Sequence, residues 1–235
     1  MKLYGIDEKE YKDNSYILSA ISNVICIGDS VTQGIGSAPT GEEAYNYSYP
    51  TRLAKMTDWT IENAGFGGIT TLGWWQTKFA NYDFTQYQLA IIELGYNGGL
   101  TDTLEVDCTG NDYTAYADTN TGAYCKIIEG IKAANPNMLI VLIISSAMNT
   151  EGDTYKIIGK IAEKYSLPVI NLTDSSYIDL NVPEYHDTPT DYIHFNALGY
   201  IAKAKYIHAG LIDYFINNQA VLTTEIITSE NTTNN

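Results

Sequence analysis

The amino-acid sequence predicts a three-layer α/β/α sandwich, in which helices cover both faces of a flavodoxin-like parallel sheet of five strands. Short apolar runs alternate along the chain with segments whose apolar residues recur at helical spacing, a pattern typical of repeated strand–helix units. The runs are almost continuously apolar, as strands covered on both faces must be. Right-handed crossovers then leave few arrangements of the strands.

Each expected strand ends at polar or glycine-rich residues, which mark the start of a loop. The expected strands cover residues 24–27, 59–63, 88–94, 138–144 and 167–172. The expected helices cover residues 49–56, 70–80, 123–134, 152–165 and 197–215. Because parallel strands end at the same edge of a sheet, we expect the following loops to gather there, where α/β proteins bind their ligands.

The chain length suits a single domain with short extensions. We expect that domain at residues 23–217, after an N-terminal extension at 1–22 and before a polar tail or linker at 218–235. Residues 100–122 hold mainly Thr, Asp, Asn and Gly. They are expected to form an inserted loop at the rim of the site rather than a linker between domains.

The charge balance excludes several kinds of partner. The sequence has 28 acidic and 13 basic residues, a net charge of −15, and no basic run. Nucleic acids and anionic membrane surfaces are therefore poor partners. An apolar run of about 18 residues is missing, and so is a charged leader followed by an apolar stretch, so we expect neither a membrane span nor a signal peptide.

Three cysteines are present, at Cys26, Cys108 and Cys125. Their spacing matches no metal-ligand pattern, so we expect no metal, and the motifs below call for no other cofactor. Only Cys108 and Cys125 are placed so that they could pair, which leaves the redox compartment open.

A small polar turn, Gly28-Asp29-Ser30, follows the first apolar run. The turn leads towards a helix, whose first backbone N–H groups are unpaired and can stabilise negative charge that develops beside Ser30. We interpret Ser30 as a candidate nucleophile. The alternative is that Asp29 and Ser30 form an ordinary N-terminal helix cap after a core strand.

A serine nucleophile requires a base, and the sequence offers three histidines. We expect His194 to be the base, because Asp191 lies three residues before it and a tight turn would bring that carboxylate to Nδ1, leaving Nε2 for Ser30. His186, in a loop rich in Pro and Asp, is the alternative base. His208 lies inside the last expected helix, where we predict a packing or surface role. The alternative role for His194 is to cap that helix.

Four segments together resemble the blocks that define the SGNH (GDSL-type) hydrolases. In chain order they are Gly28-Asp29-Ser30, residues 63–70, Gly95-Tyr96-Asn97 and Asp191-x-x-His194. The resemblance extends over residues 24–215, and the ordered set is far more specific than any one block. The Gly-x-Ser-x-Gly turn of the α/β-hydrolases is absent, because Thr32 stands where its second glycine would be.

This resemblance implies the SGNH hydrolase fold and a role for each matching residue. It implies Ser30 as nucleophile, His194 as base and Asp191 as the group that orients the base. It also implies an oxyanion hole formed by the backbone N–H groups of Ser30 and Gly68 and by the side-chain amide of Asn97. The choice of Gly68 over Gly65 or Gly67 rests on the family's spacing alone.

One position departs from the family pattern. The third block of the family usually reads Gly-x-Asn-Asp, whereas Gly98 replaces the aspartate here. The loop that holds Asn97 is therefore expected to be ordered in another way, which puts the aim of the Asn97 amide in question.

Hydrolases of this family cleave acetylated sugars, lipids and thioesters. The polar rim at 100–122 and the net charge of −15 favour a neutral, hydroxyl-rich substrate over phospholipids or coenzyme A thioesters. The expected substrate-binding residues are Asp29, Tyr96, Trp74 and Trp75, the tryptophans stacking on sugar rings unless they only pack their short helix. We therefore predict a carbohydrate O-acetylesterase.

Three alternatives remain open at this level. A lipase or thioesterase would use the same motifs on another ester. A non-catalytic glycan-binding module would keep the fold without turnover. A flavodoxin-like nucleotide or flavin binder would suit the sheet, but the first strand is not followed by a phosphate-binding glycine loop.

Overall fold

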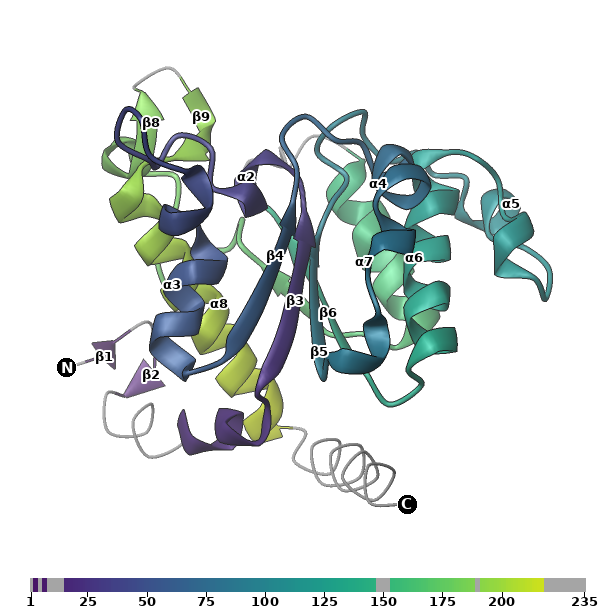
Figure 1. The fold of residues 1–235 in the computed structure, drawn as a ribbon, viewed down its shortest axis with the longest axis horizontal. Helices are drawn as coiled ribbons and strands as arrows, with labels where there is room; N and C mark the ends of the chain where they lie inside the picture. Colours follow the sequence, from purple (N-terminus) through teal and green to yellow (C-terminus); the bar gives the residue numbers. More distant parts are fainter. Residues whose placement is uncertain (1, 4–5, 8–14, 147–152, 189–190, 218–235) are drawn as a thin grey trace.

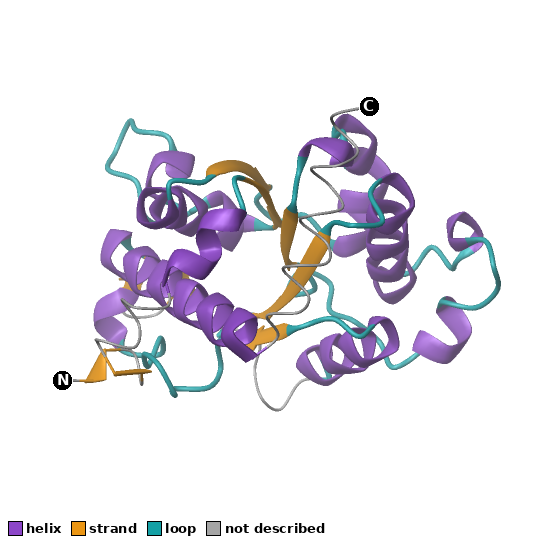
Figure 2. Ribbon diagram, turned by 90° about the horizontal axis from the view of Figure 1, so that it is seen from below, coloured by secondary structure: helices purple, strands orange, loops and turns teal. Residues whose placement is uncertain are grey.

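The computed structural model describes residues 2–3, 6–7, 15–146, 153–188 and 191–217 (Figure 1). The predicted polar tail at 218–235 and part of the N-terminal extension at 1–22 lie outside these residues. Within the described part, a central sheet is covered by helices on both faces, as Figures 1 and 2 show from two directions. The predicted three-layer α/β architecture is confirmed.

The central sheet is parallel throughout, with the strand order β4-β3-β5-β6-β7. The strands are β3 (Asn23–Gly28), β4 (Thr60–Gly65), β5 (Leu89–Glu93), β6 (Leu139–Ile144) and β7 (Val169–Asn171). All five were expected near these positions. β3 lies between β4 and β5 and brings Gly28 opposite Gly65 on one side and Glu93 on the other.

Helices α3 and α8 cover one face of the sheet, and α4, α6 and α7 cover the other (Figure 1). The α-helices are α2 (Ser30–Gln33), α3 (Tyr49–Thr57), α4 (Thr71–Thr77), α5 (Leu104–Asp107), α6 (Asn120–Ala134), α7 (Thr154–Tyr165) and α8 (Ala197–Asn217). Short 3₁₀ helices are η1 (Ser15–Ala20), η2 (Ala44–Tyr47), η3 (Phe79–Asn81), η4 (Phe84–Gln86), η5 (Tyr113–Ala115) and η6 (Pro183–Tyr185). Two small antiparallel pairs complete the fold: β1 (Lys2–Leu3) with β2 (Ile6–Asp7), and β8 (His186–Thr188) with β9 (Asp191–Phe195).

Two apolar cores form because successive side chains of a strand point to opposite faces. On β3, Val24 and Cys26 belong to the core under α3 and α8, whereas Ile25 and Ile27 belong to the core under α4, α6 and α7. All four side chains are completely buried. This explains why the strand reads as a continuous apolar run rather than an alternating one.

The pair β8–β9 differs from the sequence-based expectation. We expected a polar connection that ends in a tight turn between Asp191 and His194, but residues 191–195 form an extended strand. Its register pairs His186 with Phe195 and Thr188 with Asp191. The expected turn is wrong because these polar residues pair with a neighbouring strand that no local pattern indicates.

Residues 100–122 use their polar side chains to build an ordered loop. The buried carboxylate of Asp107 accepts hydrogen bonds from the hydroxyls of Thr103 and Thr119, the latter at 2.7 Å. The Cys108 thiol lies 3.7 Å from the carbonyl oxygen of Thr121 at the start of α6. Cys108 and Cys125 are both buried free thiols, so the pairing that their positions allow is not formed.

A buried ion pair joins α8 to the end of β5. The Lys203 ammonium donates to Glu93 Oε1 at 2.5 Å, and the two side chains are 0% and 2% exposed. The same ammonium lies 5.1 Å from the ring centroid of Tyr49 and 5.4 Å from that of Phe195. Glu93 Oε2 has no hydrogen-bond partner among the described residues. The pair thus contacts the strand that carries His194 and the first residue of α3.

Removing one member of this pair is expected to destabilise the protein strongly, because the other charge would remain buried without a partner. Lys203→Met should lower the free energy of unfolding by about 3–5 kcal/mol. The double variant, Lys203→Met with Glu93→Met, should lower it by less, because neither charge remains. Urea unfolding monitored by tryptophan fluorescence would measure both. The control is Lys160→Met, which breaks an exposed pair with Asp102 and should cost about 0–1 kcal/mol. Equal losses for Lys203→Met and Lys160→Met would contradict the expectation.

Candidate active site

Ser30 is the first residue of α2, at the point where β3 ends. Asp29 caps this short helix, since its carboxylate accepts a hydrogen bond from the Val31 N–H at 3.0 Å. Gly28 is needed before the turn, because a Cβ there would lie 1.9 Å from Thr32 Oγ1. Ser30 is half-buried and lies at the edge of the sheet where β3 ends and the loops gather.

His194 comes from β9, 164 residues further along the chain. Its Nε2 lies 3.0 Å from Ser30 Oγ, within hydrogen-bond distance. The loop after α2 packs closely on β9, since a Cβ on Gly36 would lie 3.1 Å from His194 Cβ. The structure therefore brings together the two residues that the sequence singled out as nucleophile and base.

The other candidates for the base and its partner lie elsewhere or are not described. Asp191 is the first residue of β9, and its side chain lies outside the described part of the structure. His186 is 5% exposed and stacks on Phe195 with ring centroids 5.1 Å apart. His208 is inside α8, where burial lowers its pKa to about 4. Of the three histidines, His194 is the one that contacts Ser30.

Asp29 is 3% exposed, and this burial raises the pKa of its carboxyl to about 6. The negative charge of Glu93 adds to the increase, while the Val31 N–H and the charge of Lys203 oppose it. One carboxylate oxygen serves the helix cap and the other accepts a 3.3 Å hydrogen bond from the Asn97 amide. Both carboxylate oxygens of Asp29 are thus engaged within the protein, and its role in binding substrate stays a prediction.

The glycine-rich segment that begins with the last residue of β4 has three candidate oxyanion donors. The Gly65 N–H donates to Asn63 Oδ1 at 3.0 Å, and the Gly67 N–H donates to Gln33 Oε1 at 2.6 Å. Gly68 is exposed and has a left-handed backbone with a φ of +72°, a conformation that other residues adopt rarely. Two of the three N–H groups are thus already occupied within the protein.

Asn97 connects the two loops that flank Ser30. Its amide nitrogen donates to the Ile69 carbonyl oxygen at 3.2 Å as well as to Asp29. Both contacts are long for N–H···O hydrogen bonds, and the side chain is half-buried rather than enclosed. The amide therefore lies beside the Asp29–Ser30 turn and is only weakly held by each acceptor.

The aromatic residues expected to bind sugar divide into two groups. Trp74 is completely buried, and its indole N–H donates to the Ala64 carbonyl oxygen at 3.0 Å. A sugar-stacking role for Trp74 is excluded, because the ring belongs to the core between α4 and the sheet. Trp75 is half-buried and packs on Phe79 with centroids 4.6 Å apart. Tyr96, beside Asn97, is 36% exposed.

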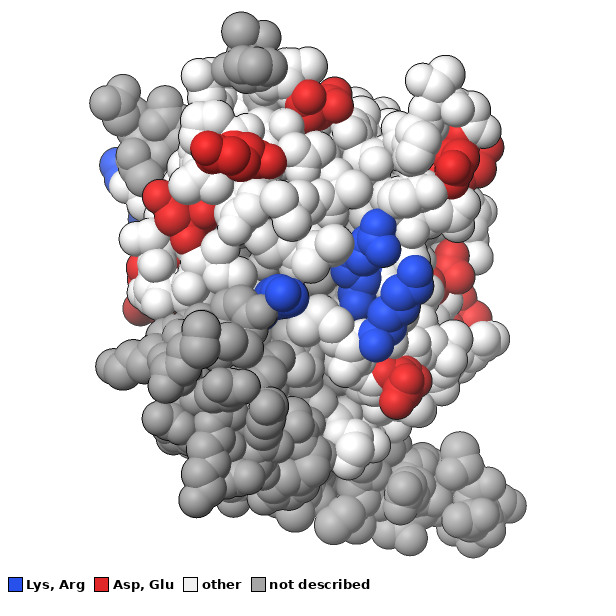
Figure 3. Space-filling view, turned by 90° about the vertical axis from the view of Figure 1, so that its left-hand side faces the viewer, with Lys and Arg blue, Asp and Glu red and all other residues white. Residues whose placement is uncertain are grey.

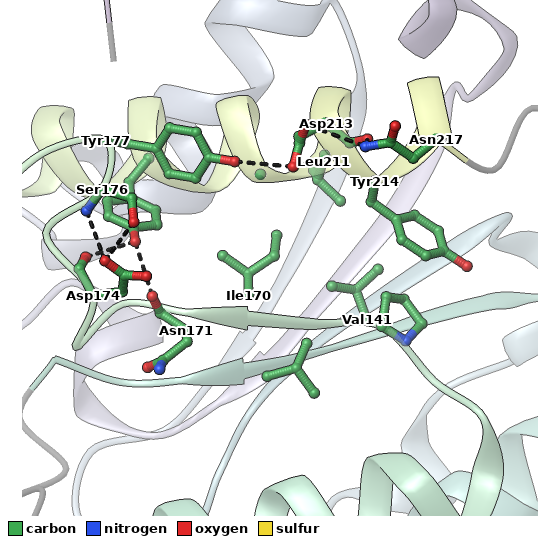
Figure 4. A pocket seen from close by; sticks show the side chains of 14 residues that line it. Val141, Ile170, Asn171, Asp174, Ser176, Tyr177, Leu211, Asp213, Tyr214 and Asn217 are labelled. Carbon is green, nitrogen blue, oxygen red and sulfur yellow. Dashed lines mark hydrogen bonds between the residues drawn. The ribbon is translucent and has the colours of Figure 1, made fainter. Parts of the chain in front are cut away.

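A separate cavity of about 390 Å³ lies between β7 and α8. Figure 4 shows Tyr177 and Tyr214 at opposite sides with Asp213 between them, and the Tyr177 hydroxyl donates to Asp213 at 3.3 Å. Ser30 and His194 are not among the residues that line it. This cavity is therefore not part of the candidate active site.

Two surface properties bear on partners. On the face in Figure 3, Lys and Arg side chains form a small group with Asp and Glu side chains spread around it. Among the helices in the described residues, none combines the length and the apolar character that crossing a membrane requires.

The sequence did not single out Glu93, Lys203 or Gln33, although each supports the site. Glu93 is the lone charge in an otherwise apolar strand, and Lys203 lies on the buried side of the last helix. A charge inside an apolar run is a signal for a buried partner, but the partner itself is not visible in the local pattern.

The chain is an α/β protein with a parallel sheet between two helical layers, and the edge of that sheet brings Ser30 and His194 together. The chain belongs to the GDSL-like lipase/acylhydrolase family, whose sequence model matches residues 26–202. This confirms the SGNH (GDSL-type) resemblance and supports acyl-hydrolase chemistry. A sequence comparison with curated proteins found no match.

Several solved structures share the fold. A two-domain esterase active on acetylated mannans aligns with a TM-score of 0.61 and 19% identity, over 91% of this chain and 53% of the other. An acetyl xylan esterase aligns with a TM-score of 0.54 and 20% identity, over 80% and 98% of the two chains. A lipase/acylhydrolase from Enterococcus faecalis aligns with a TM-score of 0.53 and 17% identity, over 83% and 97%. At these identities the likeness concerns the fold alone.

The raised pKa of Asp29 predicts a pH-dependent stability. Because the folded-state pKa is about 6 and the ordinary value about 3.9, the folded protein binds more protons than the unfolded chain between these values. The contribution of Asp29 to the free energy of unfolding is therefore present below pH 4 and falls by about 3 kcal/mol as the pH rises through 6.

Asp29→Asn keeps a capping side chain but cannot ionise, so it should lack this loss. Urea unfolding of the parent and the variant between pH 4 and pH 7 would measure the difference in free energy of unfolding between them. The variant should gain on the parent as the pH rises. A constant difference across this range would contradict the assigned shift.

Proposed function

We propose that this protein is a serine esterase, and specifically a carbohydrate O-acetylesterase. The observation that carries the proposal is the 3.0 Å distance between Ser30 Oγ and His194 Nε2. A serine hydroxyl is a weak nucleophile unless a base within hydrogen-bond distance accepts its proton as it attacks. Family membership gives the reaction class, acyl transfer, in which such a pair is used.

In the proposed mechanism, His194 accepts the proton of Ser30 Oγ while that oxygen attacks the carbonyl carbon of the ester. The tetrahedral intermediate collapses, its C–O bond to the sugar breaks, and His194 returns the proton to the leaving alkoxide. Water, deprotonated by His194, then attacks the acyl carbon. The bond between that carbon and Ser30 Oγ breaks, His194 returns the proton to Ser30 Oγ, and the acid is released. We assign to Asp191 the orientation of the His194 ring.

We assign the stabilisation of the oxyanion to hydrogen bonds from the backbone N–H groups of Ser30 and Gly68 and from the Asn97 amide. Occupied N–H groups at Gly65 and Gly67 support the choice of Gly68. The weak contacts of the Asn97 amide are compatible with its turning to an oxyanion, since the stronger acceptor would replace two long hydrogen bonds.

The substrate class is inferred from the polarity of the chain and from one exposed residue beside Asn97. The loop at 100–122 is polar, the chain carries a net charge of −15, and Tyr96 is exposed beside Asn97. These features favour a neutral, hydroxyl-rich ester over an anionic lipid or thioester. Esterases that act on acetylated mannan and acetyl xylan share the fold, which supports the proposal without deciding it. The lipase/acylhydrolase of the same fold keeps a lipase or thioesterase as the second candidate.

Ser30 is expected to form a covalent adduct with a fluorophosphonate, which reacts with activated serines. Intact mass should increase by the mass of one phosphonyl group in the parent and should not change in Ser30→Ala. His194→Ala should label slower by several orders of magnitude, because the base is lost. An unlabelled parent, or an equal adduct on Ser30→Ala, would contradict the serine-esterase proposal and favour a glycan-binding module.

Activity on p-nitrophenyl esters is expected to be highest with the acetyl ester and to fall by the octanoyl ester. We assign residues 100–122 to the rim of the site, where their polar side chains would offer a long acyl chain little apolar surface to bury. The measurement is kcat/KM across the series, with release of acetate from acetylated mannan and xylan as the direct assay. An optimum at eight to twelve carbons would overturn the O-acetylesterase proposal in favour of a lipase or thioesterase.

A further inference from the structure

Gly98 stands where the family's third block usually has an aspartate, and another side chain occupies the space. Gly98 has a left-handed backbone with a φ of +75°, and a Cβ on it would lie only 2.8 Å from Asn120 Nδ2. The same Cβ would lie 3.3 Å from the Thr70 side chain. Asn120 belongs to α6 and follows Gly98 by 22 positions, so no local pattern connects the two.

The Asn120 side chain makes two hydrogen bonds to backbone groups of different segments. Its Nδ2 donates to the Gly99 carbonyl oxygen at 3.0 Å, and its Oδ1 accepts from the Leu72 N–H at 3.0 Å. Both distances are ordinary for N–H···O bonds. Asn120 thus binds the loop after β5 to the first turn of α4.

Asn120 is not required for the start of its own helix. Thr119 is the N-cap of α6, and its hydroxyl accepts from the Gly122 N–H at 3.0 Å. Asparagine has a low intrinsic preference for helical positions, so its presence as the first helical residue has no local advantage. The two hydrogen bonds to other segments account for it.

The segments that Asn120 joins are the two that carry the proposed oxyanion donors. Gly99 follows Asn97 by two residues, and Leu72 follows the loop of Gly68 through the helix cap Thr70. The Asn97 amide spans the same pair of segments through the Ile69 carbonyl oxygen at 3.2 Å. Asn120 therefore joins the same two segments at a second point.

We propose that Asn120 is a positioning residue for the oxyanion hole and takes the structural place of the aspartate that is missing at position 98. It holds the backbone segment that carries Asn97. It thereby keeps the Asn97 amide at the distance from Gly68 that allows both groups to donate to one oxyanion. This inference rests on the proposed serine-esterase function and assigns to Asn120 no contact with substrate.

Asn120→Ala removes both hydrogen bonds and is expected to lower kcat for p-nitrophenyl acetate about 10-fold or more, with KM changed less than two-fold. The reason is that a displaced donor loses transition-state binding, and complete loss of one oxyanion donor costs about 10²–10³ in kcat. Gly98→Asp in the Asn120→Ala background should recover part of kcat, since an aspartate tolerates a left-handed backbone and enters the vacated space. Gly98→Asp alone should lower kcat, because its Cβ meets Asn120.

The deciding experiment is a double-mutant cycle between Asn120→Ala and Asn97→Ala. If Asn120 acts by positioning Asn97, its substitution should lower kcat in the parent and have almost no effect when Asn97 is already alanine. Thr119→Ala is the matched control, because it removes the α6 cap and the hydrogen bond to Asp107 without touching residues 72 or 99. Thr119→Ala should lower the urea midpoint while leaving kcat within about two-fold in both backgrounds.

The outcomes separate the two proposals. A parent that forms the Ser30 adduct and hydrolyses the acetate, with an equal Asn120→Ala effect in both backgrounds, would overturn the positioning role alone. A kcat in Asn120→Ala equal to that of the parent would do the same. A parent that forms no adduct and hydrolyses no ester would overturn the proposed function and, with it, this inference.

Discussion

The buried ion pair between Lys203 and Glu93 is the constraint on which the geometry of the site depends. Ser30 and His194 come from opposite ends of the chain, so their distance is set by how α8 and its preceding strand are held against the sheet. Glu93 is in register with Gly28, directly before the Ser30 turn, and Lys203 also contacts the ring of Phe195, the residue after His194. A charge pair with so little exposure tolerates almost no displacement, because separating the charges would leave each without compensation. The two charges also act on the pKa of Asp29: the charge of Glu93 raises it and the charge of Lys203 lowers it.

Parallel strands bring the loops of the site to one edge, but polar side chains set their separation. Gln33 binds the Gly67 N–H, Asn97 binds the Ile69 carbonyl oxygen, and Asn120 binds backbone groups of both flanking loops. Each of these amides satisfies a backbone group that the end of a strand or helix leaves unpaired. The amide side chains at this edge thus have two effects. They provide hydrogen-bond partners for backbone groups of the loops, and they fix the spacing of the proposed oxyanion donors.

The central sheet and Ser30 could be predicted from the sequence because their signals are local. A buried parallel strand is an apolar run, and the turn that ends β3 follows it directly. The pair β8–β9 could not be predicted, because its residues are polar and their pairing decides their conformation. The burial of Trp74 could not be predicted either. The sequence of a helix with aromatic residues is the same whether those residues face a core or a substrate. Lys203 and Glu93 are 110 residues apart, so each looked like an isolated charge.

A departure from a family motif carries a different meaning in the sequence and in the fold. In the sequence, Gly98 removes an aspartate and weakens the expectation that Asn97 is well aimed. In the fold, the glycine makes room for Asn120, whose amide offers both a donor and an acceptor where an aspartate would offer acceptors only. An asparagine can therefore bind a carbonyl oxygen and an N–H group together, which a carboxylate cannot do without repelling the carbonyl. The glycine and the asparagine are best understood as one unit, and a substitution at either position has meaning only together with the residue at the other.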